Sequence, residues 1–191
     1  MERLKACIAG LLSSPGLVFA FLLFICVFSL AAAFFAEGFL GLEPCHLCIY
    51  QRYPFAFGAV LAATGLAKRR ALPFSAVLLW LSSLNYLTNA GIAFYHTGVE
   101  RKWWEASELC TLPDFSAKGQ TLIENILSTP GGRCDEIPWA DPLLGLSMAN
   151  YNVILCLGLF AMSALAAVLI RRKSREVSDA ETAQDRQHDQ K

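Results

Sequence analysis

Two cysteines three residues apart precede an arginine in the segment EPCHLCIYQR, residues 43–52. A Cys-x-x-Cys disulfide closes a small ring, so it constrains the unfolded chain little and adds little stability. Such pairs are typical of reactive thiols, whose pKa is lowered by a helix N-terminus or a nearby cation. If a helix starts at Pro44, Cys45 lies at its positive end, and Cys48 and Arg52 are neighbours on one face. We therefore predict redox chemistry at this pair, with the arginine stabilising a thiolate.

The apolar segments that must position this motif are long enough to cross a membrane. Hydrophobic residues make up 55% of the 191 and charged residues 17%, against about 25% charged in ordinary soluble domains. A helix of about 20 apolar residues crosses a bilayer core of about 30 Å. The sequence predicts an all-α membrane protein in which one domain, residues 1–173, forms a four-transmembrane-helix bundle. Its spans are expected at about residues 15–36, 47–67, 71–95 and 146–170.

The first span has a competing interpretation as a signal peptide. Arg3, Lys5 and the small residues of AAAFFAEG loosely resemble a secretory signal with its cleavage site. The uncharged stretch, residues 6–36, is longer than the usual signal core of about 7–15 residues. We therefore expect a retained helix.

Lysine and arginine orient the predicted spans, because cytoplasmic loops carry an excess of both. Clusters of cations precede the first span, separate the second from the third and follow the fourth. We therefore expect cytoplasmic termini and periplasmic loops at about 37–46 and 96–145. The second loop includes KGQTLIENILS, whose Leu122, Ile123, Ile126 and Leu127 predict a short membrane-surface helix. The polar tail, residues 174–191, lacks apolar periodicity and is expected to be disordered.

This topology sorts the seven cysteines. Cys45, Cys48, Cys110 and Cys134 face the outer compartment, where disulfides form and persist. Two structural staples are one alternative for these four. Zinc is another, with His46 as a further ligand, but thiolates facing an oxidising space are poor zinc ligands, and we expect no metal. The remaining cysteines are interpreted as small apolar residues: Cys7, Cys26 and Cys156.

Arg52 lies about one turn inside the second predicted span, where a charge is costly. A snorkelling side chain, with its head group among the lipid head groups, is the alternative explanation. An arginine beside a thiolate with access from the lipid would instead suit an apolar oxidant. Quinones dissolve in the bilayer and carry two electrons, the number that a dithiol surrenders.

Four motifs in order make the chain similar to the disulfide bond formation protein B (DsbB) family of bacterial inner-membrane thiol oxidases. They are PCHLCIYQRYPF, YHTGVERKWWE before Cys110, RCDEIPW around Cys134, and GLSMANYN before the last span. The resemblance covers nearly the whole chain except the tail. It implies a four-helix protein of the inner membrane that reoxidises a periplasmic DsbA-type dithiol oxidant and passes electrons to ubiquinone or menaquinone, with no nucleic-acid partner.

The resemblance also implies roles for individual residues. Cys110 would form the mixed disulfide with the partner, and Cys134 would relay to Cys45. Cys48 would face the quinone as a thiolate, with Arg52 beside it, and His96 matches a family histidine near the quinone. A histidine that caps the outer end of the third span is the alternative for His96. The role of His46, the choice of quinone and the resting disulfide pairs stay open.

Two other functions stay open from the sequence. An enzyme of the vitamin K epoxide reductase type shares the four helices, the Cys-x-x-Cys motif and the quinone. In that family, however, the quinone-side pair follows the loop cysteines, whereas here Cys45 and Cys48 precede them. A non-enzymatic membrane scaffold with two stapled loops is the other alternative.

Overall fold

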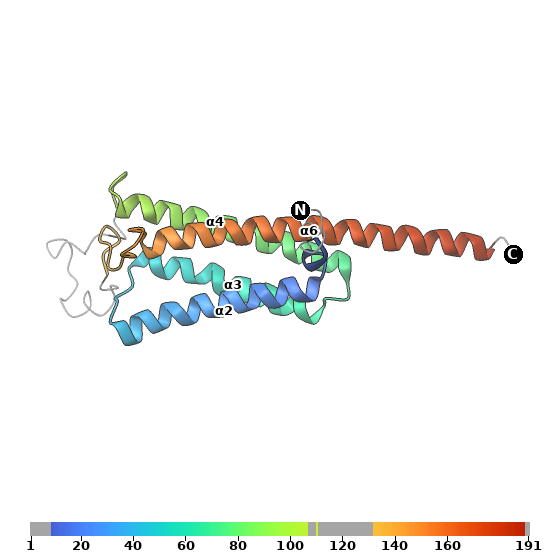
Figure 1. Cartoon of the computed structure of the whole chain (residues 1–191), viewed down its shortest axis with the longest axis horizontal. Helices are drawn as coiled ribbons and strands as arrows, with labels where there is room; N and C mark the ends of the chain where they lie inside the picture. The colour runs from blue at the N-terminus through green and yellow to red at the C-terminus, as the bar shows by residue number, and fades with distance from the viewer. Residues whose placement is uncertain (1–8, 107–109, 111–131, 190–191) are drawn as a thin grey trace, which may run out of the picture. The chain divides into compact units, whose positions relative to one another are not determined.

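The computed structural model describes residues 9–106, 110 and 132–189, and within that part the regular elements are helices. The described residues contain no strand, only an isolated backbone bridge between Ala140 and Ser147. The prediction of an all-α protein is confirmed. The long helices, seen in Figure 1, are α2 (Pro15–Leu40), α3 (His46–Ala67), α4 (Leu72–Glu100) and α6 (Met148–Asp189).

Three of these helices, α2, α4 and α6, are long and apolar enough to cross a membrane. Each also exposes large apolar side chains, among them Phe28 of α2, Leu84 of α4 and Ile154 of α6, each at least 60% exposed. Soluble proteins rarely expose large contiguous apolar surfaces, because water penalises them. The chain is therefore a membrane protein.

α3 covers the second expected span, residues 47–67, but its composition is less apolar. Its first turns hold His46, Gln51 and Arg52, and Pro54 follows them. Among the described residues, three helices have the length and composition of a membrane span. α3 lies at the position expected for the second span but does not have that composition.

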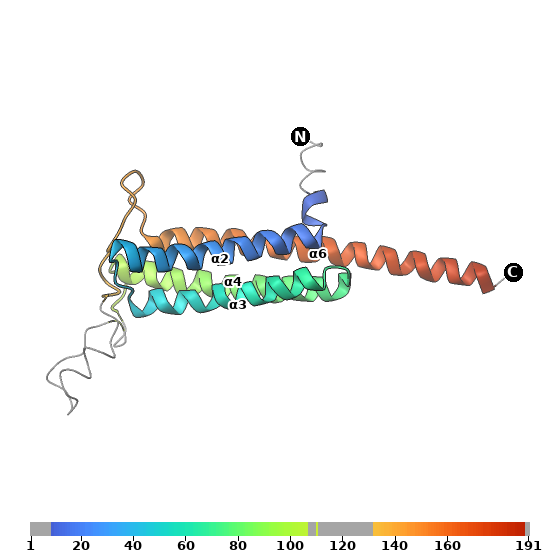
Figure 2. The same ribbon diagram turned by 90° about the horizontal axis from the view of Figure 1, so that it is seen from below.

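One compact unit consists of the chain up to Cys26, Phe57–Tyr86 and the chain from Gly158 onward. Segments of all four long helices lie side by side in it (Figure 2). Phe19 of α2 is fully buried, and its ring packs against Gly65 of α3, where a larger residue would collide with it. α2 is therefore part of the packed core of this unit.

The second compact unit, Val27–Ala56 and Leu87–Leu157, contains all four cysteines at which the sequence predicts redox chemistry. Polar contacts tie the end of its loop to the end of α4. Arg101 donates to the carbonyl oxygen of Gly145 at 3.0 Å, and the hydroxyl of Ser147 donates to the carboxylate of Glu100. These contacts hold the residues just before α6 against the end of α4.

Both α4 and α2 run further than the sequence predicts. α4 continues to Glu100, so His96 lies inside the helix instead of in the loop, and the helix ends before Lys102, whose φ is 57°. α2 continues to Leu40 and ends at Gly41, whose φ of 64° is the left-handed conformation that commonly terminates helices. Hydropathy locates the apolar part of a helix, and these ends depend on local backbone conformation instead.

The sequence predicts a disordered tail at residues 174–191, whereas α6 continues to Asp189 in the structure. The segment contains neither glycine nor proline and is rich in alanine, glutamate, glutamine and arginine, which favour helices. No glycine or proline therefore interrupts the helix that continues from the last expected span. The membrane-surface helix predicted within the second loop lies outside the described residues.

Candidate redox site

The cysteine pair lies at the start of α3, which begins at His46. Cys45 precedes the helix as its N-cap, and the backbone N–H of Cys48 donates to the Cys45 sulfur at 3.3 Å. The two Sγ atoms are 3.1 Å apart, and both cysteines are free thiols. Cys45 is buried and Cys48 is half-buried. The structure thus places the pair at the positive end of a helix dipole, as the sequence predicts.

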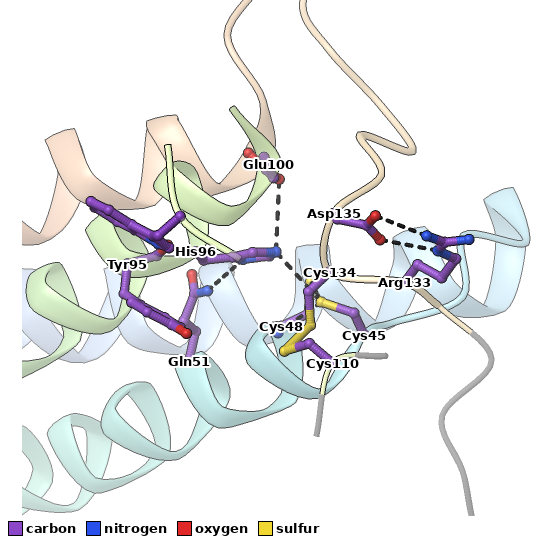
Figure 3. The surroundings of a disulfide bond; sticks show 11 residues. Cys45, Cys48, Gln51, Tyr95, His96, Glu100, Cys110, Arg133, Cys134 and Asp135 are labelled. Atoms are coloured by element: carbon purple, nitrogen blue, oxygen red, sulfur yellow. Dashed lines mark hydrogen bonds and ion pairs between the residues drawn. A yellow bond between two sulfur atoms is a disulfide. The ribbon is translucent and has the colours of Figure 1, made fainter. Parts of the chain in front are cut away.

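His96 reaches the same sulfur from α4, as Figure 3 shows. Its Nε2 lies 3.5 Å from the Cys45 Sγ, and its Nδ1 lies 2.9 Å from the amide nitrogen of Gln51. Nε2 also lies 3.8 Å from a carboxylate oxygen of Glu100, one helical turn further along α4. The imidazole is 4% exposed, so it is shielded from solvent.

These contacts favour the thiolate of Cys45. The hydrogen bond between the two cysteine side chains, with help from His96, lowers the pKa of the Cys45 thiol to about 4, although burial opposes the shift. An ordinary cysteine titrates near 8.5. In the reduced pair, a thiolate is therefore favoured at Cys45. The sequence resemblance instead implies a thiolate at Cys48, which applies to a state in which Cys45 is disulfide-bonded.

The loop cysteines form a disulfide between Cys110 and Cys134, with Cα atoms 5.3 Å apart. Both belong to one buried cluster with Cys45 and Val99, and Cys48 packs against that cluster. Figure 3 shows the disulfide beside the free pair. Four cysteines from three separate parts of the chain therefore meet, which thiol–disulfide exchange requires.

Gly132 allows the loop to approach the residues before α3. A Cβ atom at this position would lie 2.5 Å from the carbonyl oxygen of Glu43 and 2.9 Å from the backbone nitrogen of Cys45. Both distances are too short for real side chains, and the obstacles are backbone atoms that cannot rotate away. Because residue 132 has no side chain, the loop can approach Cys45 closely enough to bring Cys134, two residues further on, into the cluster.

Charged residues flank Cys134 on the loop. Arg133 donates two hydrogen bonds to Asp135, at 3.0 and 2.8 Å, and its Nε lies 3.3 Å from Glu136. The guanidinium lowers the pKa of the Asp135 carboxyl below its ordinary range. Arg133 and Glu136 also line a cavity of about 30 Å³ that borders Cys45, Cys48 and His96. A cavity of this size holds about one water molecule.

Arg52, four residues after Cys48 on α3, is paired with α2. Its Nη1 lies 2.8 Å from a carboxylate oxygen of Glu37, and its guanidinium carbon lies 5.0 Å from the centre of the Phe34 ring. The side chain is 18% exposed. The structure records these two partners for the guanidinium, whereas the sequence predicts Cys48 as its neighbour on the helix face.

Metal ligation is the alternative use of the same atoms. The ligand atoms of Cys45, Cys48 and His96 lie within 4.8 Å of one another, so by distance alone they could surround an ion. The sequence suggested His46, Cys110 or Cys134 as further zinc ligands. Cys110 and Cys134 are bonded to each other, and a disulfide sulfur is not a thiolate ligand.

Sequence reasoning missed three residues of the site: Gln51, Glu100 and Asn152. Gln51 lies within the quoted motif, and Glu100 follows His96 at the helical spacing of four. Those spacings were available signals for both. Asn152 donates to Gln51 across 101 residues of sequence, and no local pattern indicates that contact.

A free cysteine pair packed against a disulfide, within a helical membrane protein, is the arrangement of a membrane-bound thiol–disulfide oxidoreductase. The comparison with known families agrees. The chain belongs to the disulfide bond formation protein DsbB family, whose model matches residues 15–166. Membership implies disulfide oxidoreductase activity in disulfide bond formation.

Curated relatives with the name disulfide bond formation protein B match over most of their length. The protein of Albidiferax ferrireducens is 29% identical over 171 residues, which cover 87% of this chain and 94% of the relative. That of a Polaromonas species is 32% identical, covering 85% and 94%. That of Xanthomonas axonopodis pv. citri is 33% identical, covering 78% and 88%. No solved structure gives a significant match.

Proposed function

We propose that the protein reoxidises a periplasmic dithiol oxidant of the DsbA type and passes the two electrons to a membrane quinone. The observation that carries the proposal is the buried cluster in which the Cys110–Cys134 disulfide packs against Cys45 and Cys48. The cluster supports exchange between the two pairs without large movement of the helices. A scaffold with two fixed staples fits less well, because Cys45 and Cys48 are free thiols in the same buried place.

The proposed topology has four spans, with both termini in the cytoplasm of a bacterium and the cysteines at the periplasmic side of its inner membrane. The cation clusters support this orientation. α3 does not meet the composition of a membrane span among the described residues, and its polar residues concentrate in the turns next to the cysteine pair. Polar residues within a span commonly mark functional sites.

The exchange proceeds in steps that conserve electrons. A partner thiolate attacks Cys110, forms a mixed disulfide and releases Cys134 as a thiolate. Cys134 attacks Cys45 of an oxidised α3 pair, forms a Cys45–Cys134 bond and releases Cys48. The second thiol of the partner then attacks the mixed disulfide, so the partner leaves oxidised and Cys110 is left as a thiolate.

The last exchange restores the loop disulfide. The Cys110 thiolate attacks Cys134, the Cys110–Cys134 bond forms, and Cys45 leaves as a thiolate. The product has an oxidised loop pair and a reduced α3 pair, the combination found in this structure. A leaving thiol with a low pKa departs faster, so the lowered pKa of Cys45 supports this step.

The residues at the start of α3 fit a quinone on its lipid side. Cys48 is half-buried, and Arg52 offers guanidinium donors above the exposed ring of Phe34, next to the exposed Tyr53. When bound, a quinone accepts two electrons and two protons. We propose that Arg52 and Cys48 hold it. The cavity of about 30 Å³ beside the cysteines has room for about one water, so the quinone ring would require a different position.

His96 was expected near the quinone, and its surroundings suggest an indirect part. Both ring nitrogens have protein partners, Cys45 or Glu100 at Nε2 and Gln51 at Nδ1. We propose that His96 acts on the sulfur of Cys45 instead of binding the quinone directly.

Disulfide mapping after one turnover tests the relay. The fully oxidised protein would be mixed with a reduced DsbA-type protein without added quinone, quenched with acid and digested without reduction. The proposal predicts a Cys45–Cys134 bond and a Cys110–partner bond as transient products. Fixed Cys45–Cys48 and Cys110–Cys134 pairs at all times would instead indicate a stapled scaffold.

A further inference from the structure

A row of buried and half-buried hydrogen bonds begins at the Cys45 sulfur and continues away from the disulfide. His96 on α4 is its first member, with Nε2 at 3.5 Å from the sulfur. Gln51 on α3 lies 2.9 Å from Nδ1 of the same ring, and Asn152 on α6 donates to the carbonyl oxygen of Gln51. Gln51 is 7% exposed and His96 3% exposed, so water competes little for these bonds.

The direction of each bond follows from the groups that make it. An amide nitrogen only donates and an amide oxygen only accepts. Because Asn152 donates to the oxygen of Gln51, the NH2 group of Gln51 is left to face His96. Nδ1 must then accept, which puts the proton of a neutral imidazole on Nε2. Nε2–H therefore donates to the sulfur of Cys45.

The hydrogen bonds further from Cys45 have their donors and acceptors in the same order. The thiol of Cys156 donates to the oxygen of Asn152 at 3.2 Å, and the amide of Asn89 donates to the Cys156 sulfur at 3.3 Å. Every donor thus points toward Cys45. Chains of aligned hydrogen bonds polarise one another in a low-dielectric interior. The row ends at a neutral amide, so it orients and stabilises charge and supplies no proton.

We propose that Gln51 and Asn152 are positioning residues that hold His96 as the Nε2–H tautomer aimed at Cys45. The inference rests on the proposed function, in which Cys45 leaves as a thiolate when the Cys110–Cys134 disulfide forms again. A donor fixed on the Cys45 sulfur stabilises the charge that this step creates. Neither residue touches the reacting sulfur atoms, so both act through the imidazole.

Other ionisable groups surround Cys45 and His96, and the test variants must leave these groups unchanged. Glu100 lies nearest to the imidazole and accepts the hydroxyl proton of Ser147. The titratable or charged groups around Cys45 and His96, from α3, α4 and both flanking loops, are Cys48, Glu100, Glu43, Arg133 and Glu136.

The test exchanges donor and acceptor in the hydrogen bond between residue 152 and Gln51. Asn152→Asp offers only acceptor oxygens, so the NH2 group of Gln51 must turn toward residue 152 and its oxygen toward His96. The neutral imidazole then carries its proton on Nδ1, and Nε2 no longer donates to Cys45. Asn152→Leu removes the contact without adding charge. Asn150→Asp is the matched control, because Asn150 lies on the same helix and bonds to Thr97 instead of Gln51.

Two readouts require neither partner nor quinone. The first is the ¹⁵N chemical shifts of His96 in full-length protein with His46 and His188 replaced by glutamine, which identify the protonated nitrogen. The second is the pH midpoint of Cys45 alkylation in a Cys48→Ser background, with the loop disulfide intact. We expect Nε2–H in the parent protein and Nδ1–H in Asn152→Asp. The alkylation midpoint should rise by at least one pH unit, about tenfold in the acid constant, and rise less in Asn152→Leu.

A parent protein with the proton on Nδ1 would overturn the inference, and so would an unchanged midpoint in Asn152→Asp. An equal rise in Asn150→Asp would also overturn it, because the effect would then be that of an added charge. If Asn152→Asp does not fold, Asn152→Leu decides by the same two readouts. Failure of the proposed function would appear separately, as a protein with these properties that never reduces quinone.

Discussion

Replacement of Gly132 by alanine tests how closely the loop must approach the helix pair. The new methyl group would lie 2.5 Å from the backbone oxygen of Glu43 and 2.9 Å from the backbone of Pro44 and Cys45, whereas ordinary contacts begin at 3.4 Å, so the loop must retreat by about 0.9 Å. A displacement of about 1 Å at a reacting centre can cost about a hundredfold in rate. We expect formation of the Cys45–Cys134 bond to slow by roughly tenfold or more. The Cys110–Cys134 disulfide should still form, because both of its cysteines move with the loop.

The assay is rapid mixing of oxidised protein with an excess of reduced DsbA-type partner, followed by acid quenching and non-reducing peptide mapping. Gly91→Ala serves as the control, because Gly91 lies in α4 of the same unit and a Cβ there meets no atom within 4 Å. A wild-type rate in Gly132→Ala would refute the claim that this contact sets the position of Cys134. Equal slowing in Gly91→Ala would show that the effect is unspecific.

Three further predictions follow from the site and its surroundings. With the α3 pair reduced and the loop disulfide intact, the alkylation rate of Cys45, followed by peptide mapping, should stay constant from pH 8 down to about 6 and fall only below that, since a pKa of about 4 leaves a hundredfold excess of thiolate at pH 6. An ordinary thiol would lose about tenfold per pH unit over the same range. Arg52→Met should raise the KM for quinone or lower kcat by about tenfold or more, while thiol–disulfide exchange at Cys110 is unchanged. Wild-type quinone kinetics in this variant would mean that Arg52 only pairs with Glu37 and does not bind the quinone. Leu143→Cys, at a position that is 86% exposed in the periplasmic loop, should react with a membrane-impermeant reagent in intact spheroplasts. Ala180→Cys, at an exposed position of α6 on the cytoplasmic side, should react only after lysis.

The helices and the cysteine pair could be predicted from the sequence because both are local signals. Long apolar runs locate α2, α4 and α6, and the start of α3 follows from Pro44 and the motif after it. The extension of α4 past His96 was missed, because hydropathy falls before the helix itself ends. The helical tail was missed for a similar reason: its residues have good helix propensity and lack only an apolar face.

The contacts that orient His96 could not be predicted, because they join distant parts of the chain. Gln51 and Asn152 are polar residues on separate helices, and nothing in either segment specifies the other. The pairing of Arg52 with Glu37 is a similar case: the spacing of four residues favoured Cys48, and the structure adds a carboxylate from α2. Local spacing predicts neighbours on one helix, and packing decides which neighbour a long side chain reaches.

Electron balance in a single reaction tests the central claim most directly. The purified full-length protein would be supplied with a reduced DsbA-type protein and ubiquinone or menaquinone under exclusion of oxygen, and both partner thiols and quinone absorbance would be followed. The account predicts one quinone reduced for each partner dithiol oxidised, with turnover abolished in Cys45→Ala and in Cys110→Ala. Partner oxidation without quinone reduction, or quinone reduction that persists in Cys45→Ala, would contradict the account.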